Sequence, residues 1–315
     1  MGIQLLNTFL NNTVSDVTEK VHMGDLCGKR VVIDAYIYMY RYAANGSIIE
    51  NIYSMCSIFR RYGIHAMFIF DGYNISADKD HTLQKRRDDK GVAAIKYSKC
   101  ENKLVDMAEG DEKDKLLKEM VTLKRKSVKI TKADVCEVKS LLDAYGIMHR
   151  TADGEADELC AALVINKRAY ACLSEDTDLF VYNCTRVLKY LSLVQHTAIM
   201  YNIANITSHI DISISNFQVM CVCSGTDYTR KYRSIFENYK LYLESGKIPD
   251  FKQWLLDNKY LTKEEGDNVE YECLRYNDNT RKVLESKTYF LIRNRKYNYV
   301  DLRNILSMHG FVFAE

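Results

Sequence analysis

Short runs of consecutive apolar residues, each followed by acidic residues, recur along the first two thirds of the chain. Three such runs lie at residues 31–33, 66–70 and 169–173. The acids that follow them are Asp34, Asp71, and Asp176 with Asp178. Segments of helical length separate the runs. Continuous apolar runs in this arrangement are typical of parallel strands buried on both faces, so the pattern predicts an α/β fold.

Two further segments carry apolar residues at helical spacing. In "TKADVCEVKSLLDAYGI", Thr131 is a suitable N-cap, apolar residues recur between positions 135 and 142, and Gly146 is the predicted stop. The segment "GEADELCAALVINKR" predicts a second helix with an acidic first turn, which the helix dipole favours. Either Asp153 or Gly154 is suited to cap it.

The character of the chain changes between Gly72 and Lys132. From Lys79 to Lys129 there are fifteen Lys or Arg residues against ten Asp or Glu. The stretch is too long for an ordinary loop, and pieces such as "DEKDKLLKEMVTLKRK" can form helices with mixed-charge faces. We predict a helical insertion over the strand ends, although a pair of solvated charged helices without function fits the pattern as well. After Tyr228 the chain is polar, rich in tyrosine and predicted to be helical.

The composition is that of a globular protein, with 47% hydrophobic and 27% charged residues among 315. The ten cysteines show no zinc-type spacing, and no secretory pattern precedes them. We therefore expect reduced thiols and an intracellular protein of the nucleus or cytoplasm. No apolar run approaches the roughly 18 residues of a membrane span, so no membrane association is expected.

The acidic residues are the candidates for chemistry. Besides the acids at the strand ends, Glu155 and Asp157 open a predicted helix, and Asp227 lies in the small-residue loop "CSGTDYT". The carboxyl ends of parallel strands share one edge of a sheet, so these acids can converge. Converging carboxylates repel one another unless cations neutralise them, and all-oxygen sites suit Mg²⁺ or Mn²⁺. Two such ions can activate a water and stabilise the leaving oxygen of a phosphodiester.

Each acid also has a purely structural interpretation. Asp71 and Gly72 form a common turn pair, Glu155 and Asp157 could serve the helix N-terminus, and Asp176 could cap the following element. Glu175 is expected on the opposite face from Asp176 and is given no metal role. The joint pattern also suits a phosphatase or a magnesium-dependent kinase-like site. No GxxxxGK[ST] loop is present, which argues against an NTPase.

Eight segments, in order and with matching spacing, resemble one known family. They are "MGIQLL", "VVIDAYIYMY", "FIFDG", "LQKRR", "VKITKADVCEVKSLLDAYGI", "GEADELCAAL", "SEDTDLFVY" and "SGTDYT". Over about residues 1–230 the chain resembles the flap endonuclease/XPG family of structure-specific 5′-nucleases. The resemblance implies a PIN-like α/β fold, in which helices flank a central, mostly parallel sheet. It also implies a nuclease core at residues 1–228, a helical arch at 72–132 within it, and a helical DNA-binding region at 229–315.

The resemblance assigns roles to individual residues. It implies that two Mg²⁺ ions, for which Mn²⁺ can substitute, are held by seven acids: Asp34, Asp71, Glu155, Asp157, Asp176, Asp178 and Asp227. Asp157 stands where the family usually has Glu, so its shorter side chain is expected to reach a metal through water. The implied catalytic residues are Asp34, Asp71, Asp178, Lys79 and Arg86. Lys79 and Arg86 match a basic pair that contacts the scissile phosphate.

The family's substrates imply that this chain acts on flapped or branched DNA, as a 5′-flap endonuclease or 5′–3′ exonuclease in replication, repair or recombination. Tyr40 matches a residue that stacks on the base beside the scissile phosphate. Further DNA contacts are implied for Gly2, Lys85 and Arg87. By themselves, Tyr40 would be expected in the core and the basic residues in solvent.

Two departures from the family pattern bear on substrate choice and partners. After Asp227 the family has a glycine-rich hairpin that grips duplex DNA, whereas this chain has no Gly-x-Gly there. Four basic residues could replace part of that grip: Arg230, Lys231, Arg233 and Lys240. The sequence also lacks a sliding-clamp-binding peptide, so recruitment to a clamp is not expected. Two alternatives stay open, a catalytically degenerate scaffold that binds DNA or protein and a junction resolvase that acts as a dimer.

Overall fold

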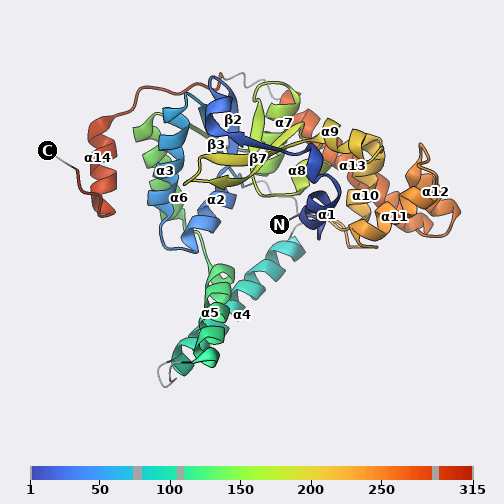
Figure 1. Ribbon diagram of the computed structural model, residues 1–315, viewed down its shortest axis with the longest axis horizontal. Coiled ribbons are helices and arrows are strands. Elements are labelled where there is room, and N and C mark those ends of the chain that lie inside the picture. The colour runs from blue at the N-terminus through green and yellow to red at the C-terminus, as the bar shows by residue number, and fades with distance from the viewer. Residues whose placement is uncertain (1, 74–79, 105–109, 286–290, 314–315) are drawn as a thin grey trace.

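The computed structural model of the protein describes residues 2–73, 80–104, 110–285 and 291–313; for residues 80–83, 85, 86 and 282–285 it describes the backbone only. A central sheet is flanked by helices, and a long helical hairpin projects from one side of this body (Figure 1). The α/β architecture expected from the apolar runs is therefore confirmed.

The sheet has seven strands in the order β1-β7-β6-β5-β2-β3-β4. Their bounds are Glu19–His22 (β1), Arg30–Asp34 (β2), His65–Phe70 (β3), Met148–Thr151 (β4), Ala171–Leu173 (β5), Arg186–Ser192 (β6) and Thr197–Asn202 (β7). The strands from β6 to β4 in this order run parallel, whereas β7 pairs antiparallel with both β6 and β1. The three predicted runs form β2, β3 and β5, three neighbours at the centre of the sheet.

Helices cover both faces of the sheet because the strands bury alternate residues on each side. The α-helices of the described residues are α1 (Leu6–Thr13), α2 (Ala35–Ala43), α3 (Ile48–Arg61), α4 (Asp80–Leu104), α5 (Asp111–Ser127), α6 (Lys132–Tyr145), α7 (Ala156–Ile165), α8 (Asp178–Val181), α9 (Ile203–His209), α10 (Ile214–Cys223), α11 (Ile235–Glu244), α12 (Phe251–Asp257), α13 (Lys263–Glu285) and α14 (Tyr299–Met308). Two short 3₁₀ turns span Ser15–Val17 and Met23–Leu26. Val32 packs with α1, α7 and α10 on one face, whereas Val31 and Ile33 pack with α2, α3 and α6 on the other.

The chain changes direction across the sheet at β2. It first proceeds from β2 to β3 and β4 on one side, and it then returns to add β5 and β6 on the other side. The carboxyl ends of β2 and β5 therefore flank a topological switch point. In open α/β sheets this is the place where connecting loops diverge and a ligand crevice forms.

The ends of α6 agree with the sequence prediction, and the start of α7 does not. Thr131 caps α6 through a reciprocal box with Asp134, in which the Asp134 N–H donates to Thr131 Oγ1 over 3.1 Å. Gly146 ends that helix with a φ of 70°. The prediction that Asp153 or Gly154 caps α7 was wrong, because Glu155 occupies the N-cap position. The Gly154 carbonyl instead accepts a hydrogen bond from the N–H of Gly72.

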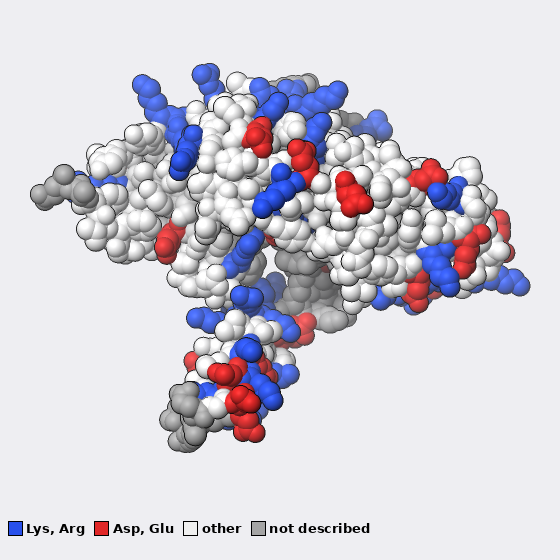
Figure 2. Space-filling view, viewed as in Figure 1, with Lys and Arg blue, Asp and Glu red and all other residues white. Residues whose placement is uncertain are grey.

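The charged insertion forms a hairpin of α4 and α5 that stands away from the sheet (Figure 1). Its two helices share a small apolar core of Ala93, Cys100, Met120 and Leu123. Lysine, arginine and acidic side chains make up much of its described surface, among exposed apolar residues such as Val92 and Ile95 (Figure 2). The predicted helical insertion is therefore confirmed, and it owes its helix pairing to a narrow apolar seam rather than to the main core.

The residues after 228 pack on two separate parts of the body. Helices α11 and α12 pack against α10, and α13 packs along α7 and α10, whereas α14 packs on α6 at the other end of the molecule (Figure 1). The division of the chain at residue 228 stays a prediction. All ten cysteines lie in described segments and are free thiols. Among the described residues, no helix combines the length and hydropathy needed to cross a bilayer.

Candidate metal and DNA site

Asp34 lies at the switch point between β2 and β5. It is the last residue of β2 and caps α2, where its Oδ1 accepts a 3.4 Å hydrogen bond from the Ile37 N–H. Its other oxygen accepts a 3.2 Å bond from the hydroxyl of Ser174, the residue after β5. The side chain is buried. Its two hydrogen bonds fix the carboxylate at the sheet edge where both strands end.

Asp71 reaches the same edge from β3 and is held by α7. Its Oδ1 accepts a 2.8 Å hydrogen bond from the Ala156 N–H, in the first turn of that helix. Gly72 makes this approach possible, because its N–H bonds Gly154 O over 2.7 Å and a Cβ there would lie 2.5 Å from Asp153 O. The close packing of these two loops places Asp71 beside the N-terminus of α7, where a negative charge is favourable.

Asp176 and Asp178 follow β5 in a short, self-bonded turn. The Asp178 N–H donates to Asp176 Oδ1 over 3.1 Å, and the Asp176 N–H donates to Ser174 Oγ over the same distance. Both acids are buried. Ser174 thus bonds the backbone of this turn as well as Asp34, so one hydroxyl ties the ends of β2 and β5 together.

The N-terminus of the chain closes over this turn. The Ile3 N–H donates to Thr177 Oγ1 over 2.7 Å. Gly2 adopts a φ of +77°, and a Cβ at this position would lie 2.5 Å from Asp176 Oδ1 and 2.7 Å from Asp178 Oδ1. Only glycine has room there without a shift of the acids.

The acids interact electrostatically. Burial, together with the negative charges of Asp71 and Asp176, raises the pKa of Asp34 to about 8. The Asp157 carboxylate is buried in the first turn of α7, where it accepts a 2.8 Å bond from the Glu158 N–H. Burial also raises the pKa of Cys160 to about 11, and the charges of Asp34 and Asp157 both contribute to that rise. Acids from β2, β3, β5 and α7 therefore face one shared buried region.

The remaining two candidate acids lie at the border of this region. Glu155 is buried at the N-cap of α7, directly before the residue that binds Asp71. Asp227 is half-buried in the loop after α10. Burial raises the pKa of Tyr276 well above its usual value, the charges of Asp178 and Asp157 raise it further, and the side chain of Thr226 lowers it. Asp227 therefore follows a residue that borders the acidic region.

The donor set fits a hard divalent cation. Every candidate ligand is a carboxylate, and the mutual repulsion that raises the pKa of Asp34 would be relieved by positive charge. Within the described part of the chain, no three Asp, Glu, His or Cys side chains meet as a ready-made metal site. The case for a divalent cation therefore rests on the carboxylate oxygens, on their burial and on their repulsion of one another.

Comparison with known protein families identifies the chain's relatives. The model of the XPG N-terminal domain matches residues 1–93, and the model of the XPG I-region matches residues 146–227. Together they cover more than half of the chain and contain all seven candidate acids. The chain belongs to the flap endonuclease/XPG family of nucleases.

Individual relatives agree with this membership. Flap endonuclease 1 of Meyerozyma guilliermondii is 25% identical over 284 residues, which cover 84% of this chain and 73% of that protein. The catalytic core of Rad2 in complex with a DNA substrate has the same fold, with a TM-score of 0.64 at 19% identity and coverage of 97% of this chain and 95% of that one. Human GEN1 in complex with Holliday junction DNA gives a TM-score of 0.63 at 15% identity, covering 98% of this chain and 74% of GEN1.

Tyr40 is half-buried in the second half of α2, beside helix α4 of the α4–α5 hairpin. The Lys90 ammonium lies 4.2 Å from the centre of its ring and donates a 3.1 Å hydrogen bond to its hydroxyl. Tyr40 is therefore a surface ring in contact with the hairpin. Arg87 is exposed on α4. Lys79 and the side chains of Lys85 and Arg86 lie outside the described residues.

Three residues that support the acids were not predicted from the sequence. Ser174 and Thr177 are the small hydroxyl residues within "SEDTD", and their spacing around the acids was the available signal. Lys189 is fully buried in β6, where its ammonium donates 2.9 Å bonds to Asn7 Oδ1 and Glu175 O. Burial lowers the pKa of Lys189 to about 8, against the opposing effect of the Glu175 and Asp176 charges.

Glu175 itself faces away from the candidate metal site. Its carboxylate lies 3.3 Å from the Arg41 guanidinium and accepts a 2.8 Å bond from the Tyr190 N–H. A carboxylate with these two partners is satisfied on the opposite side of the turn. The structure therefore agrees with leaving Glu175 out of the ligand set.

The basic residues that follow Asp227 make contacts within the chain. Arg230 pairs with Glu265 at 2.9 Å, and Lys240 pairs with Glu244 at 3.7 Å. Lys231 donates to Gln4 Oε1 over 3.2 Å, and Arg233 donates to the Tyr260 carbonyl. That these four residues replace part of a grip on duplex DNA stays a prediction.

Proposed function

We propose that the protein is a Mg²⁺-dependent, structure-specific DNA endonuclease that cuts near the junction of a 5′ single-stranded flap and duplex DNA. One observation carries this proposal. Buried acids from the ends of β2 and β5 lie at one sheet edge with the half-buried Asp71 and the start of α7, and the charged α4–α5 hairpin contacts α2, the helix that Asp34 caps. Family membership supports nuclease chemistry at such a site.

Asp34, Asp71, Asp176 and Asp178 are the proposed direct ligands of two Mg²⁺ ions, which Mn²⁺ can replace. Glu155, Asp157 and Asp227 are proposed to complete the shells, Asp157 through water because of its shorter side chain. When bound, such ions supply a water of lowered pKa and stabilise the charge that develops on the phosphate. The role of the protein is to hold buried oxygens in fixed positions, which Ser174 and the N-terminus of α7 do through backbone and hydroxyl donors.

Lys79 and Arg86, whose positions in the sequence place them at the start of the insertion, are proposed to hold the scissile phosphate. Tyr40 is proposed to stack on the unpaired base beside it, since base stacking on an aromatic ring tolerates any sequence. Gly2, Lys85 and Arg87 are proposed to contact the DNA backbone. Positive side chains near a phosphate position it without reading its sequence.

The direct test offers the purified protein a labelled 5′-flap, a nicked duplex and a four-way junction, each with Mg²⁺ and with EDTA. We expect Mg²⁺-dependent cleavage of the flap at its junction. Cleavage of the four-way junction alone would assign the protein to junction resolution. A protein that binds these DNAs and cuts none of them with either Mg²⁺ or Mn²⁺ would be a scaffold, and the proposal would fail.

A further inference from the structure

The amino ends of three adjacent strands form a basic pocket on the edge of the sheet opposite the acids. Lys29 and Arg30 enter it at the start of β2, Lys167 and Arg168 from the turn before β5, and Arg186 at the start of β6. Its volume is about 500 Å³. Because β2 has five residues, this pocket lies roughly 13 Å or more from the carboxyl end of that strand.

Four of the cations that line this pocket have no acidic partner in the described part of the chain. Its lining contains no Asp or Glu. Within the described residues, Lys29, Arg30, Lys167 and Arg186 form no ion pair. Several like charges around one hollow raise the local potential and attract anions.

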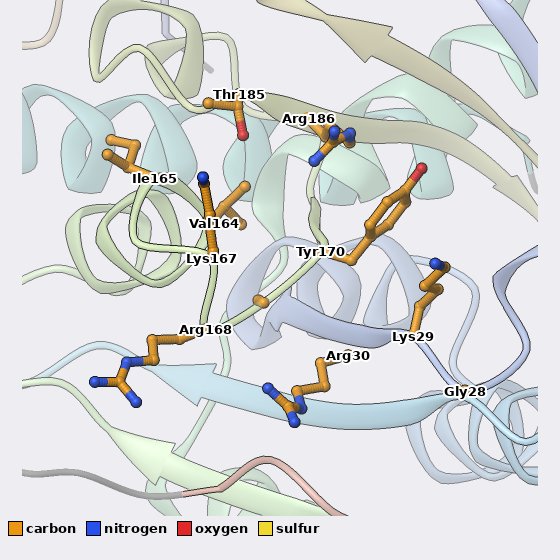
Figure 3. Close-up of a pocket in the computed structure, with 11 residues that line it drawn as sticks. Gly28, Lys29, Arg30, Val164, Ile165, Lys167, Arg168, Tyr170, Thr185 and Arg186 are labelled. Atoms are coloured by element: carbon orange, nitrogen blue, oxygen red, sulfur yellow. The ribbon is translucent and has the colours of Figure 1, made fainter.

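An aromatic ring fixes two of these cations. The Lys29 ammonium lies 5.1 Å and the Arg186 guanidinium 4.6 Å from the centre of the Tyr170 ring, which lies between them (Figure 3). The Tyr170 N–H also donates a 2.7 Å bond to Arg30 O, which ties the turn to β2. Because the ring already contacts two cations, the pocket is suited to phosphate groups rather than to a stacked base.

The positive surface continues beyond the pocket along the same sheet edge. Exposed Arg293, Arg295 and Lys296 lie in a segment that covers the amino ends of β3 and β4. The Arg293 N–H contacts Met148 Sδ, and the Arg295 N–H donates a 2.7 Å bond to Gly146 O. Lysines and arginines gather along the side of the molecule away from the α4–α5 hairpin (Figure 2). A stripe of this length suits a chain of phosphates better than a single small anion.

We propose that this pocket and the adjoining stripe bind the phosphate backbone of a second nucleic-acid segment, on the sheet edge opposite the cleavage site. Lys29, Arg30, Lys167 and Arg186 contact successive phosphates. The choice of nucleic acid as ligand rests on the proposed function, whereas the location and charge of the pocket do not. One protein molecule then holds two DNA segments at once, one at the cleavage site and one at the basic pocket.

The test measures how many DNA molecules one protein binds. The full chain is saturated with an unlabelled short 5′-flap in EDTA, and a labelled blunt duplex is then titrated at several salt concentrations. Wild-type protein should bind the second duplex. The double variant Lys29→Glu/Lys167→Glu should bind the second duplex more weakly, with a salt slope lower by about 2 because two phosphate contacts are gone. Lys29→Arg/Lys167→Arg should retain the wild-type binding.

The matched control is Lys20→Glu, which reverses one exposed lysine on the edge strand β1. It should bind the second duplex as the wild type does. Cleavage of the short flap in Mg²⁺ should be unchanged by Lys29→Glu/Lys167→Glu, which separates this site from the proposed nuclease site. Equal second-duplex binding by the double variant and wild type would overturn the proposal. The proposal would also be overturned if inorganic tripolyphosphate raised the melting temperature of the protein while no second duplex bound.

Discussion

The Lys90 ammonium lies 4.2 Å from the centre of the Tyr40 ring and 3.1 Å from its hydroxyl oxygen, so the insertion helix α4 contacts the proposed base-stacking residue directly. A cation above an aromatic ring at a partly exposed site contributes about 0.5–1 kcal/mol. A contact of this strength can be exchanged for a base without unfolding the hairpin. A base that stacks on Tyr40 would therefore replace the contact between Lys90 and the ring, and so affect how α4 is held.

Tyr40→Ala is expected to slow single-turnover flap cleavage by roughly 10- to 100-fold, because stacking on one base contributes about 1–3 kcal/mol. Tyr40→Phe keeps the ring and should cleave at close to the wild-type rate, although it loses the hydrogen bond from Lys90. Thermal unfolding of both variants provides the folding control. If Tyr40→Ala cleaves as fast as Tyr40→Phe, the ring does not stack on the substrate.

Asp178→Ala is expected to abolish cleavage and to leave binding of the flap DNA intact. The side chain is 1% exposed and lies in the turn after β5 that carries two of the proposed ligands. Its removal takes away a ligand oxygen but none of the basic surface. Cleavage with Mg²⁺ and DNA binding with EDTA are measured separately. The control is Asp153→Ala, which removes an exposed acid in the β4–α7 loop and should cleave normally. Cleavage by Asp178→Ala with Mg²⁺ would show that Asp178 does not belong to the site.

The pH dependence of stability tests the charge state of the acids. Asp34 has a pKa of about 8 in the folded protein against 3.8 as a free side chain, so the folded state binds the proton more tightly. In EDTA its stabilising contribution is complete below about pH 4 and is lost as the pH rises through about 8. The melting temperature of metal-free protein should therefore fall between about pH 4 and pH 8, and Mg²⁺ should raise it more at the upper end, where the ion has no proton to displace.

Asp34→Asn keeps the shape of the side chain and removes its titration. The variant should lose the part of the pH slope that Asp34 contributes, along with most of the Mg²⁺ effect. Differential scanning fluorimetry across the pH range measures both quantities. A slope identical to that of the wild type would show that another group titrates.

The acids could be predicted from the sequence because two local rules combine. Apolar runs identify buried parallel strands, and parallel strands present their carboxyl ends at one edge. Thr131 and Gly146 were likewise predictable, since a helix cap depends on residues three or four positions away. The strands β6 and β7 were not predicted. They form an antiparallel hairpin with a register irregularity between Lys189 and Ser192, and a buried lysine interrupts the apolar pattern of β6.

The supporting contacts of the site depend on residues that are distant in sequence. Nothing near Lys189 shows that Asn7 and the Glu175 carbonyl will satisfy its ammonium group. The N-cap of α7 was mispredicted for the same reason, because the carboxylate that accepts the Ala156 N–H at its start belongs to Asp71, which follows β3. Local pattern determines which elements form, whereas these hydrogen bonds exist only after the elements pack.

The N-terminal glycine offers a matched test of how closely the chain approaches the acids. Gly2 and Gly46 have nearly equal φ values, +77° and +75°, so Ala introduces similar backbone strain at both. A Cβ at Gly2 would press on Asp176 and Asp178, whereas a Cβ at Gly46 meets nothing within 4 Å. Gly2→Ala should therefore reduce flap cleavage at least about tenfold, since displacement of a metal ligand by about 1 Å can slow a reaction a hundredfold. Gly46→Ala should cleave normally and lose only about 1 kcal/mol of stability. Single-turnover rates and thermal unfolding of the two variants are compared directly. Equal cleavage by both would mean that the N-terminus yields to the added methyl group without moving the acids.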